Sequence, residues 1–476
     1  NPATDDYQSL HPKPGLADLF MTRRDFLARA GSGFGLTALT ALMAMGELPG
    51  FEVVGQDSNF SPLAPKKPHW PVKAKRILQI FAQGAPTQID TWDPKPELQK
   101  IDGQQISGGR RNGTAFGSPF TFEKKGQSGL EMSSVWPQLA QHADKLTVIR
   151  SMHTDIPAHD TAQVMFNTGS LRRIMPSFGS WVLYGLGSEN QSLPGFVALS
   201  NGDINANNFR SAFLPGAFQG TQVDARARRP EDLIANIQNR NISMPEQRRQ
   251  LDLLHTLNEV HKQKMRKDGQ LEARLQAYEL AFKMQTEALD AFDASKEPES
   301  VRKMYGNTTE GRKMLIARRL LERGVRFVQV WHGGWDHHNN IADRLPQKAG
   351  EIDGPMAALL TDLERKGMLE DTLVFWGGEF GRTPVADGPA GNPGRNHNSR
   401  AFSMMLAGGG VKGGTAYGAT DELGGEAVEN KVHIHDFHAT LLAILGFDHK
   451  KLTFRHQGRD FRLTDVYGNV VKDILS

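Results

Sequence analysis

Six short apolar runs recur along the chain, separated by segments with helical spacing. They are Arg76–Phe81, Leu146–Arg150, Gly195–Leu199, Val325–Trp331, Thr372–Gly377 and Ser403–Gly408. Most are continuous rather than alternating in polarity, which is typical of strands buried on both faces of a sheet. Segments with helical spacing, such as Gly311–Gly324 and Asp353–Met368, lie between them. This alternation predicts an α/β sandwich with a mainly parallel sheet.

One region departs from the alternation. The segment 224–297 is highly charged and carries no strand signal. Apolar side chains keep helical spacing in two stretches, at Leu251, Leu254 and Leu257 and again at Leu271, Leu275, Tyr278 and Phe282. We interpret the region as two long helices that turn near Asp268 and Gly269, an α-helical hairpin inserted into the sandwich.

The first fifty residues are interpreted as a leader rather than as part of the fold. The stretch "TRRDFL" (Thr22–Leu27) precedes a mild apolar run that ends near Met45, which is the layout of a signal peptide. Its paired arginines resemble the twin-arginine export signal. We therefore expect 51–476 to be the folded domain, exported through the twin-arginine translocase to the periplasm or the extracellular space. An amphipathic N-terminal helix is the alternative.

Composition excludes several functional classes. The 56 Lys and Arg residues nearly balance the 53 Asp and Glu residues, so the net charge of +3 indicates no nucleic-acid partner. The absence of cysteine excludes disulfides, thiolate zinc sites and cysteine nucleophiles, and with them a sulfatase whose active residue is made from cysteine. No segment after the leader approaches eighteen apolar residues, so no stable membrane span is expected in the mature chain.

Reactive side chains follow several of the predicted strands. In order along the chain they are Asp90 and Asp93, then His153 and His159, then Asp336, His337 and His338, and finally Glu379, Arg382 and His397. Ligands of open parallel sheets bind beyond the carboxyl ends of the strands. The sequence therefore predicts a functional site at that edge of the sheet.

The strongest candidate cluster is "WHGGWDHHNN", which follows the fourth strand. Asp336 and His338 are two residues apart in an extended segment, so both side chains can point the same way. The glycine pair Gly333–Gly334 lets the backbone turn before it presents them. Mixed carboxylate and imidazole ligands suit Zn²⁺ or Mn²⁺, with Ca²⁺ or Mg²⁺ possible. The alternative is a capped loop with exposed histidines.

The other candidate site residues each have two possible interpretations. Glu379 lies at a strand end and needs a partner, either Arg382 or a metal ion. Arg382 and Arg395 could grip an anionic substrate. His397 lies in a Gly/Asn/Pro loop and is either a metal ligand or a surface residue. His153 and His159 are each either a site residue or a histidine with a structural hydrogen bond.

Two further motifs are weaker. "AGGGVKGG" (Ala407–Gly414) lacks the ending of a phosphate loop and is expected to be a glycine-rich turn. The stretch "HIHDFHATLLAILG" predicts a helix whose start is capped near Asp436, with metal binding by its histidines as a second interpretation.

Several motifs together resemble a family of exported bacterial proteins of unknown function in the alkaline phosphatase/sulfatase superfamily. They include "GAPTQIDTWDPKP", "HDTAQVMFNTG", "LPGFVAL", "WDHHNN", "DTLVFWGGEFGRTP", "GGGVKGGTAYGATDE" and "DFHATLLAILGFDHKKL". The resemblance covers nearly the whole chain after the leader. It implies an alkaline-phosphatase-like three-layer sandwich and hydrolysis of phosphate or sulfate esters at one or two divalent ions.

The same resemblance implies roles for particular residues, with departures. Asp336, His338 and His397 match one metal position, and Glu379 would complete it. His159 stands roughly where the superfamily places its nucleophile, with His153 as a helper and Thr161 or water as an alternative nucleophile. Gln83 and Phe380 stand where further metal ligands are expected.

Two hypotheses follow from the sequence. The first is an exported metallohydrolase of a small-molecule or glycan ester, in which Arg382 and Arg395 bind the anionic group. The second is a degenerate relative that binds a ligand, a glycan or a protein partner without turnover. The departures at Gln83 and Phe380 favour the second hypothesis, and the Asp/His/Glu cluster favours the first.

Overall fold

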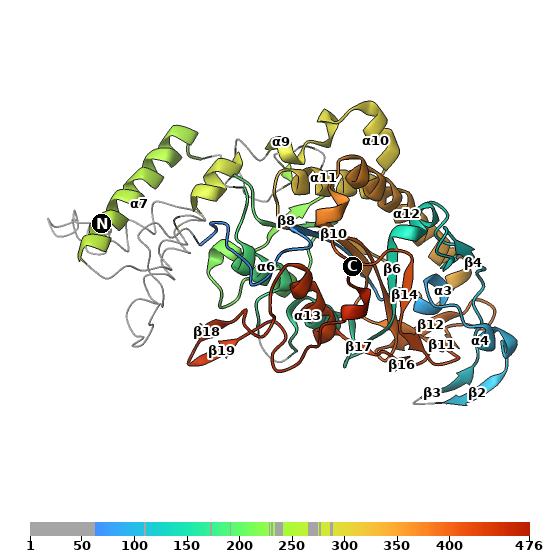
Figure 1. The fold of residues 1–476 in the computed structure, drawn as a ribbon. Helices are drawn as coiled ribbons and strands as arrows, with labels where there is room; N and C mark the ends of the chain where they lie inside the picture. The colour runs from blue at the N-terminus through green and yellow to red at the C-terminus, as the bar shows by residue number, and fades with distance from the viewer. Residues whose placement is uncertain are drawn as a thin grey trace, which may run out of the picture. The chain divides into compact units, whose positions relative to one another are not determined.

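A nine-stranded sheet forms the middle layer of the protein in a computed structural model (Figure 1). All six predicted strands are present: β1 (Arg76–Gln83), β6 (Leu146–His153), β7 (Phe196–Ser200), β9 (Phe327–Gly333), β10 (Thr372–Gly377) and β13 (Phe402–Gly408). Three shorter strands complete the sheet: β8 (Thr221–Asp224), β14 (Thr415–Tyr417) and β17 (Val432–His433). The order is β14-β6-β13-β10-β1-β9-β7-β8, and β17 pairs with β6.

The structure describes residues 62–476 except 109–110, 172–173, 191, 228, 230–231, 234–240, 265–274, 276–277 and 286–288. These residues belong to one compact unit, Ser61–Ser476. The predicted leader, 1–50, lies outside the described residues, as does the predicted turn at Asp268 and Gly269. Among the helices that the structure describes, none combines the length and the apolarity that a membrane crossing requires.

The sheet is mixed but mainly parallel, as the sequence predicts. The central strand β1 pairs in parallel with β10 on one side and with β9 on the other. β13 runs antiparallel to both of its neighbours, β10 and β6. Because the direction reverses twice across β13, β6 points the same way as β1, β9 and β10, and the carboxyl ends of these four strands lie at one edge.

Helices cover both faces of the sheet, which makes three layers. One face packs against α11 (Thr309–Glu322) and α12 (Ile341–Arg365), and the other against α5 (His159–Thr168), α6 (Phe178–Leu186) and α13 (Ile434–Ile444). Strand β1 shows why, since Leu78 and Ile80 belong to the first apolar cluster and Ile77 and Phe81 to the second. In Figure 1, α11 and α12 lie above the sheet and α6 and α13 below it.

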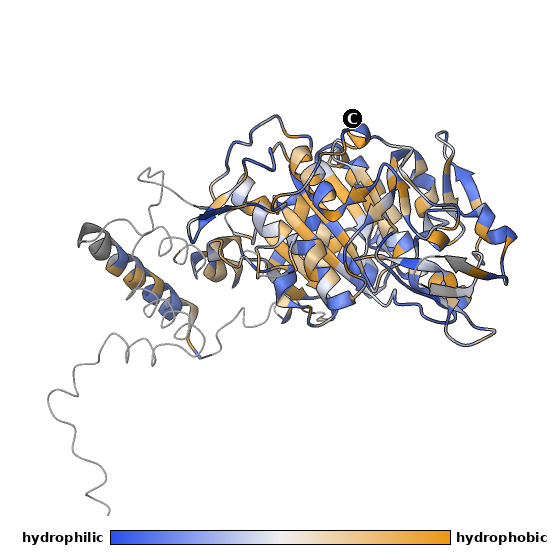
Figure 2. Ribbon diagram, turned by 90° about the horizontal axis from the view of Figure 1, so that it is seen from below, coloured by the Kyte–Doolittle hydropathy of each residue, from blue (hydrophilic) through white to orange (hydrophobic). Residues whose placement is uncertain are grey.

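The distribution of apolar residues over the fold agrees with this layering. In Figure 2 the strands at the centre are orange, and the blue segments lie mostly at the periphery. A strand with both faces covered by helices needs apolar residues at every position, which accounts for the continuous apolar runs of the sequence. The predicted α/β class is confirmed.

Smaller elements surround the sandwich. The short helices are α3 (Gln88–Thr91), α4 (Pro96–Lys100), α9 (Leu289–Phe292) and α10 (Glu299–Tyr305). Two-stranded sheets are formed by β2 (Gln105–Gly108) with β3 (Arg111–Thr114), β4 (Phe122–Lys125) with β5 (Leu130–Ser133), β11 (Gly381–Asp387) with β12 (Gly394–Asn398), β15 (Ala419–Thr420) with β16 (Ala427–Glu429), and β18 (Phe454–His456) with β19 (Arg459–Phe461).

Within the predicted insertion, the structure describes one long helix, α7 (Met244–Lys264). It contains the first stretch of spaced leucines, Leu251, Leu254 and Leu257. Since the turn and much of the second stretch lie outside the described residues, the hairpin itself stays a prediction.

Candidate metal centre

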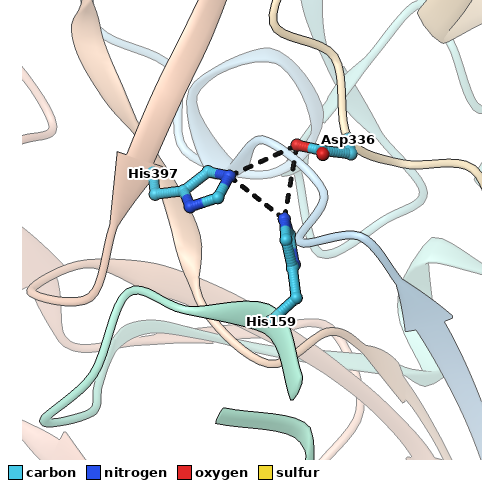
Figure 3. A group of neighbouring side chains, drawn as sticks. All are labelled: His159, Asp336 and His397. Atoms are coloured by element: carbon cyan, nitrogen blue, oxygen red, sulfur yellow. Dashed lines mark hydrogen bonds and ion pairs between the residues drawn. The ribbon is translucent and has the colours of Figure 1, made fainter. Parts of the chain in front are cut away.

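Three segments distant in sequence bring imidazole and carboxylate groups together at the carboxyl edge of the sheet. His159 is the first residue of α5, which follows β6. Asp336 and His338 lie in the loop after β9, and His397 lies in β12. Figure 3 shows His159, Asp336 and His397 pointing toward one another.

The distances define a compact group of ligand-type atoms. Asp336 Oδ1 lies 3.4 Å from His159 Nε2 and 3.4 Å from His397 Nε2, and these two nitrogens are 3.0 Å apart. His338 Nε2 lies 2.9 Å from Asp336 Oδ1 and 2.9 Å from His397 Nε2. Of the predicted ligands, Asp336, His338 and His397 are therefore brought together, and His159 joins them.

The outer nitrogen of each imidazole faces a hydrogen-bond acceptor. His159 Nδ1 lies 2.6 Å from Glu379 Oε1, His338 Nδ1 lies 2.6 Å from Asp387 Oδ2, and His397 Nδ1 lies 2.9 Å from the carbonyl oxygen of Pro157. A neutral imidazole places its one proton on the nitrogen that has an acceptor. The three Nε2 atoms are then unprotonated acceptors, each within 3.4 Å of Asp336 Oδ1.

Such a convergence of acceptors fits a small divalent ion. A tetrahedral shell with bonds of about 2.0–2.1 Å separates its ligand atoms by about 3.3–3.4 Å, and an octahedral shell by about 2.9 Å. The observed separations of 2.9 to 3.4 Å cover this range. Extra protons shared between the imidazoles are the alternative. The ligand set of nitrogen and carboxylate oxygen suits Zn²⁺ or Mn²⁺.

Glu379, predicted to complete the metal position, lies behind His159 rather than among these ligand atoms. It is fully buried, and its carboxylate accepts from the backbone N–H of Gly84 at 3.1 Å and faces His159 Nδ1. The imidazole ring of His159 therefore separates Glu379 from the group. In this place a carboxylate orients the ring and raises the basicity of the opposite nitrogen.

Arg382 lies at the site, but its hydrogen bonds differ from the predicted grip on a substrate. Its Nη2 donates to Asp336 Oδ1 at 2.5 Å and to the carbonyl oxygen of Gly84 at 2.5 Å. The other nitrogens donate to the carbonyl oxygens of Ala85 and Arg395, and Nη1 lies 3.4 Å from His338 Nε2. The buried guanidinium group thus anchors Asp336 and places a fixed positive charge beside the group.

Arg395, predicted as a substrate ligand, has internal partners for its whole guanidinium group. It is fully buried and forms a bidentate ion pair with Asp90 at 2.7 and 3.0 Å. Its remaining N–H groups donate to the carbonyl oxygens of Phe116, Gly117 and Thr383. Because these contacts use all five donors, Arg395 has none left for an anion.

The other two predicted catalytic residues have contacts elsewhere. The ring of His153 lies 5.1 Å from the ring of His433 on the neighbouring strand β17. Thr161 is exposed and donates to the carbonyl oxygen of Ala158. Residues two apart on a helix do not face the same side, so Thr161 does not share the direction of His159. Neither residue has a recorded contact with the Nε2 atoms or with Asp336.

Local backbone geometry explains how the loops approach so closely. Gly84, directly after β1, has φ +109°, and a Cβ there would lie 2.7 Å from the backbone nitrogen of Asp336. Only glycine tolerates both conditions. In the predicted glycine hinge, Gly334 has φ +93°, which confirms the sharp turn before Asp336.

Burial and charge shift the pKa values at the site in opposite directions. Burial lowers the pKa of His159, but the hydrogen bond and charge of Glu379 and the charge of Asp336 outweigh it and raise the value overall. Burial acts to raise the pKa of Asp336, but Arg382 holds it well below its usual range. Burial lowers the pKa of His397. Asp336 is thus ionised, as a metal ligand must be.

Sequence reasoning missed two contributors to the site. Asp387, in β11, holds His338 from behind, and Gly84 carries backbone contacts to both Glu379 and Arg382. No local pattern marks Asp387, because its contact joins segments 49 residues apart. The position of Gly84 could have indicated its role, since a glycine directly after a buried strand often permits another backbone segment to approach closely.

Comparison with known proteins identifies a family. The model of the family described as "Protein of unknown function (DUF1501)" matches residues 74–475. No curated protein matches.

Several solved structures show distant similarity. The lipoteichoic acid synthase LtaP from Listeria monocytogenes has 8% identity and a TM-score of 0.36, with 82% of this chain and 75% of that chain covered. The PsFucS1 sulfatase from Pseudoalteromonas sp. has 13% identity and a TM-score of 0.32, covering 79% and 68%. Alkaline phosphatase from the Antarctic bacterium TAB5 has 12% identity and a TM-score of 0.31, covering 73% and 94%.

Proposed function

This chain belongs to DUF1501, a family described only as proteins of unknown function, and from that premise we propose that it is a metal-dependent hydrolase of phosphate or sulfate esters. The proposal assigns His159, Asp336 and His397 as the metal ligands, with His338 Nε2 beside them at 2.9 Å from Asp336 Oδ1. It replaces the predicted ligand Glu379 by His159, and it leaves attack on the ester to water rather than to a side chain.

One observation carries the proposal: the Nε2 atoms of His159 and His397 and Asp336 Oδ1 lie close together, while the Nδ1 atom of each histidine has its own acceptor. Lone pairs at these separations repel each other unless a cation or a shared proton lies among them. Structural metal sites rarely leave their ligands open to solvent, but the side chain of Asp336 is 43% exposed and that of His338 is 35% exposed. An accessible ion with protein ligands on one side is the arrangement of a catalytic centre.

The chain supplies binding and electrostatics to the reaction. A bound divalent ion would polarise the ester and lower the pKa of the attacking water. Arg382 keeps Asp336 ionised and adds a buried positive charge that favours an anionic ester over a neutral one. Glu379 and Asp387 hold the rings of His159 and His338 so that their Nε2 atoms stay in place.

The test combines metal analysis with ester hydrolysis. Purified protein is expected to contain zinc or manganese by mass spectrometry and to hydrolyse 4-nitrophenyl phosphate or 4-nitrophenyl sulfate. Asp336→Asn should lose the metal and reduce turnover by at least about a hundredfold, because it removes both a ligand and its charge. Asp343→Asn, an exposed aspartate in the first turn of α12, is the matched control. Turnover that persists in a metal-free protein would refute the proposal.

A second candidate function is binding without turnover. The observation in its favour is that Arg382 already pairs with Asp336, so the carboxylate has a cationic partner within the chain. Gln83 and Phe380 stand where the superfamily resemblance implies further ligands, and Phe380 is fully buried. A purified protein that binds no zinc or manganese, and whose unfolding transition a chelator leaves unchanged, would favour this candidate.

We also propose export by the twin-arginine route, on the resemblance of Thr22–Leu27 to that signal. Replacing Arg23 and Arg24 by lysine should retain the protein in the cytoplasm of a host that has the translocase. Cell fractionation followed by immunoblotting measures this. Export that continues with the lysine pair would contradict the route.

A further inference from the structure

A polar pocket lies at the start of α13, at the same edge of the sheet as the candidate metal centre. It has a volume of about 400 Å³, and its lining includes His433, His435, Asp436, Lys450, Tyr467 and Asn469. The volume is within the range of small-molecule sites. His433 pairs in register with His153 at the carboxyl ends of the adjacent parallel strands β17 and β6, so the pocket belongs to the same edge of the sheet.

One short segment connects this pocket with the metal centre. After β6, Asp155 Oδ2 lies 3.3 Å from His433 Nε2, and the carbonyl oxygen of Pro157 lies 2.9 Å from His397 Nδ1. His159 follows two residues later. Four residues of extended chain span at most about 14 Å, so one ligand of two or three sugar rings could reach both places.

An exposed aromatic ring forms one wall of the pocket. The residue Tyr467 is 61% exposed, and its ring stacks on His435 with centroids 5.1 Å apart and an interplanar angle of 29°. His435 is only 5% exposed, and its Nδ1 has no hydrogen-bond partner among the described residues. The stack leaves the other face of Tyr467 free for the C–H-rich face of a sugar ring, which packs on aromatic rings as an apolar surface does.

The polar groups around Tyr467 suit hydroxyl groups better than an anion. Lys450 can donate hydrogen bonds, as can the second N–H of the Asn469 side chain, whose first donates to Asp436 Oδ1 at 3.2 Å. Asp436 also accepts from the backbone N–H groups of His433 and Asn469, which leaves one lone pair of its carboxylate for a hydroxyl group. The N-terminus of α13 is already capped, since the His433 side chain accepts from the N–H of His435 and Asp436 accepts from the N–H of His433. The N–H of His435, one of the donors that would attract a phosphate or sulfate at this helix start, is therefore engaged, and Asp436 would repel the anion.

We propose that this pocket binds an uncharged sugar ring of a carbohydrate chain, with Tyr467 as the stacking platform. The pocket itself follows from the contacts above. Its role as a subsite, which makes the substrate a glycan ester, rests on the proposed hydrolase function.

The test measures binding rather than turnover. Titration calorimetry on the whole mature protein, with EDTA present, uses cellohexaose, laminarihexaose, chitohexaose and agarohexaose. We expect at least one of these to bind. Tyr467→Ala should weaken that binding by about tenfold or more, and Tyr467→Phe, which keeps the ring, by less than about threefold. Val428→Ala, an exposed apolar residue in β16, is the control for unspecific surface effects.

Three results would overturn the inference: no binding of any of these oligosaccharides, equal binding by Tyr467→Ala, or inorganic sulfate that competes for the same site. Because the measurement needs neither metal nor catalysis, these results are separate from failure of the hydrolase proposal. A protein that lacks turnover can still show binding that depends on Tyr467.

Discussion

Two carboxylates act behind the imidazoles of the candidate metal centre, and each can be tested alone. Glu379→Gln keeps an acceptor for the N–H of His159 and of Gly84 but removes the charge. We expect the dissociation constant of zinc to rise about 10- to 100-fold, because a neutral partner makes His159 Nε2 a poorer ligand. Competition with a fluorescent chelator measures this constant.

Asp387→Asn is the matching change behind His338. If His338 is a ligand, this variant should weaken zinc binding to a similar degree. Unchanged affinity in both variants would mean that the imidazoles do not bind the ion through Nε2.

His438 provides a test of stability against pH that does not involve the metal centre. It is buried in α13, and its Nε2 hydrogen-bonds to the carbonyl oxygen of Phe166 at 2.8 Å. Burial lowers the pKa of His438 to about 3, against 6.5 for an ordinary histidine. The unfolded chain therefore binds the proton first, and stability that is present above pH 6.5 is lost as the pH falls toward 3.

Between pH 7 and pH 5 this one group should lower the free energy of unfolding by about 2 kcal/mol. In His438→Gln, which keeps a donor for Phe166 but does not titrate, that part of the loss should vanish. Urea unfolding at the two pH values measures it. His69→Gln, at an exposed histidine, is the control and should leave the pH dependence as in the native protein.

The role of a single residue could be predicted from the sequence only where its partners lie close to it in the chain. Asp336 and His338 were identifiable because strand, glycine turn and ligands are consecutive. The roles predicted for Glu379 and Arg395 differ from the contacts in the structure because each side chain meets a distant partner, His159 in one case and Asp90 in the other. A carboxylate or guanidinium group beside a strand looks the same in sequence whether it faces a substrate or a neighbouring loop.

At the scale of elements, the site depends on the loop after β1 passing directly against the loop after β9. Gly84→Ala would place a methyl group 2.7 Å from the backbone nitrogen of Asp336, at a φ of +109° that alanine rarely adopts. We expect a loss of about 1–3 kcal/mol in the free energy of unfolding and a strong loss of zinc affinity. Gly350→Ala is the control, since its Cβ meets no atom within 4 Å and alanine favours helix α12.

Differential scanning fluorimetry and zinc titration of both variants measure these effects. A Gly84→Ala protein with native stability and native zinc affinity would show that the close approach of the two loops is not required.

Strands and helices were predictable to different degrees. The six main strands and helices α11, α12 and α13 were predicted from their apolar runs and periodicity, and the capped start of α13 is confirmed by the capping box of His433 and Asp436. The antiparallel direction of β13 was not predicted. A strand buried on both faces is a continuous apolar run in either direction, so its polarity depends on which neighbours it pairs with.

For the whole molecule, the ligands come from segments that are separate in the unfolded chain. His159 and His397 are 238 residues apart, so a metal ion that needs both binds only the native state. An excess of zinc about a hundredfold over its dissociation constant should raise the free energy of unfolding by about 2.7 kcal/mol relative to the chelated protein. The chain has no cysteine that would bind zinc when unfolded.

Urea unfolding with zinc and with EDTA measures this difference. In Asp336→Asn the two curves should coincide. Equal stability of the native protein under both conditions would argue against a metal that bridges these segments.

Local patterns in the sequence determined the α/β class, the six main strands and the chemical types that gather at their ends, because periodicity and strand-end position are properties of neighbouring residues. Only the tertiary structure decided that His159 joins Asp336, that Glu379 and Asp387 lie behind the imidazoles, and that both arginines are committed to internal partners. Those roles are pair contacts between remote segments. Their free energies depend on the distance and burial that packing of the layers creates.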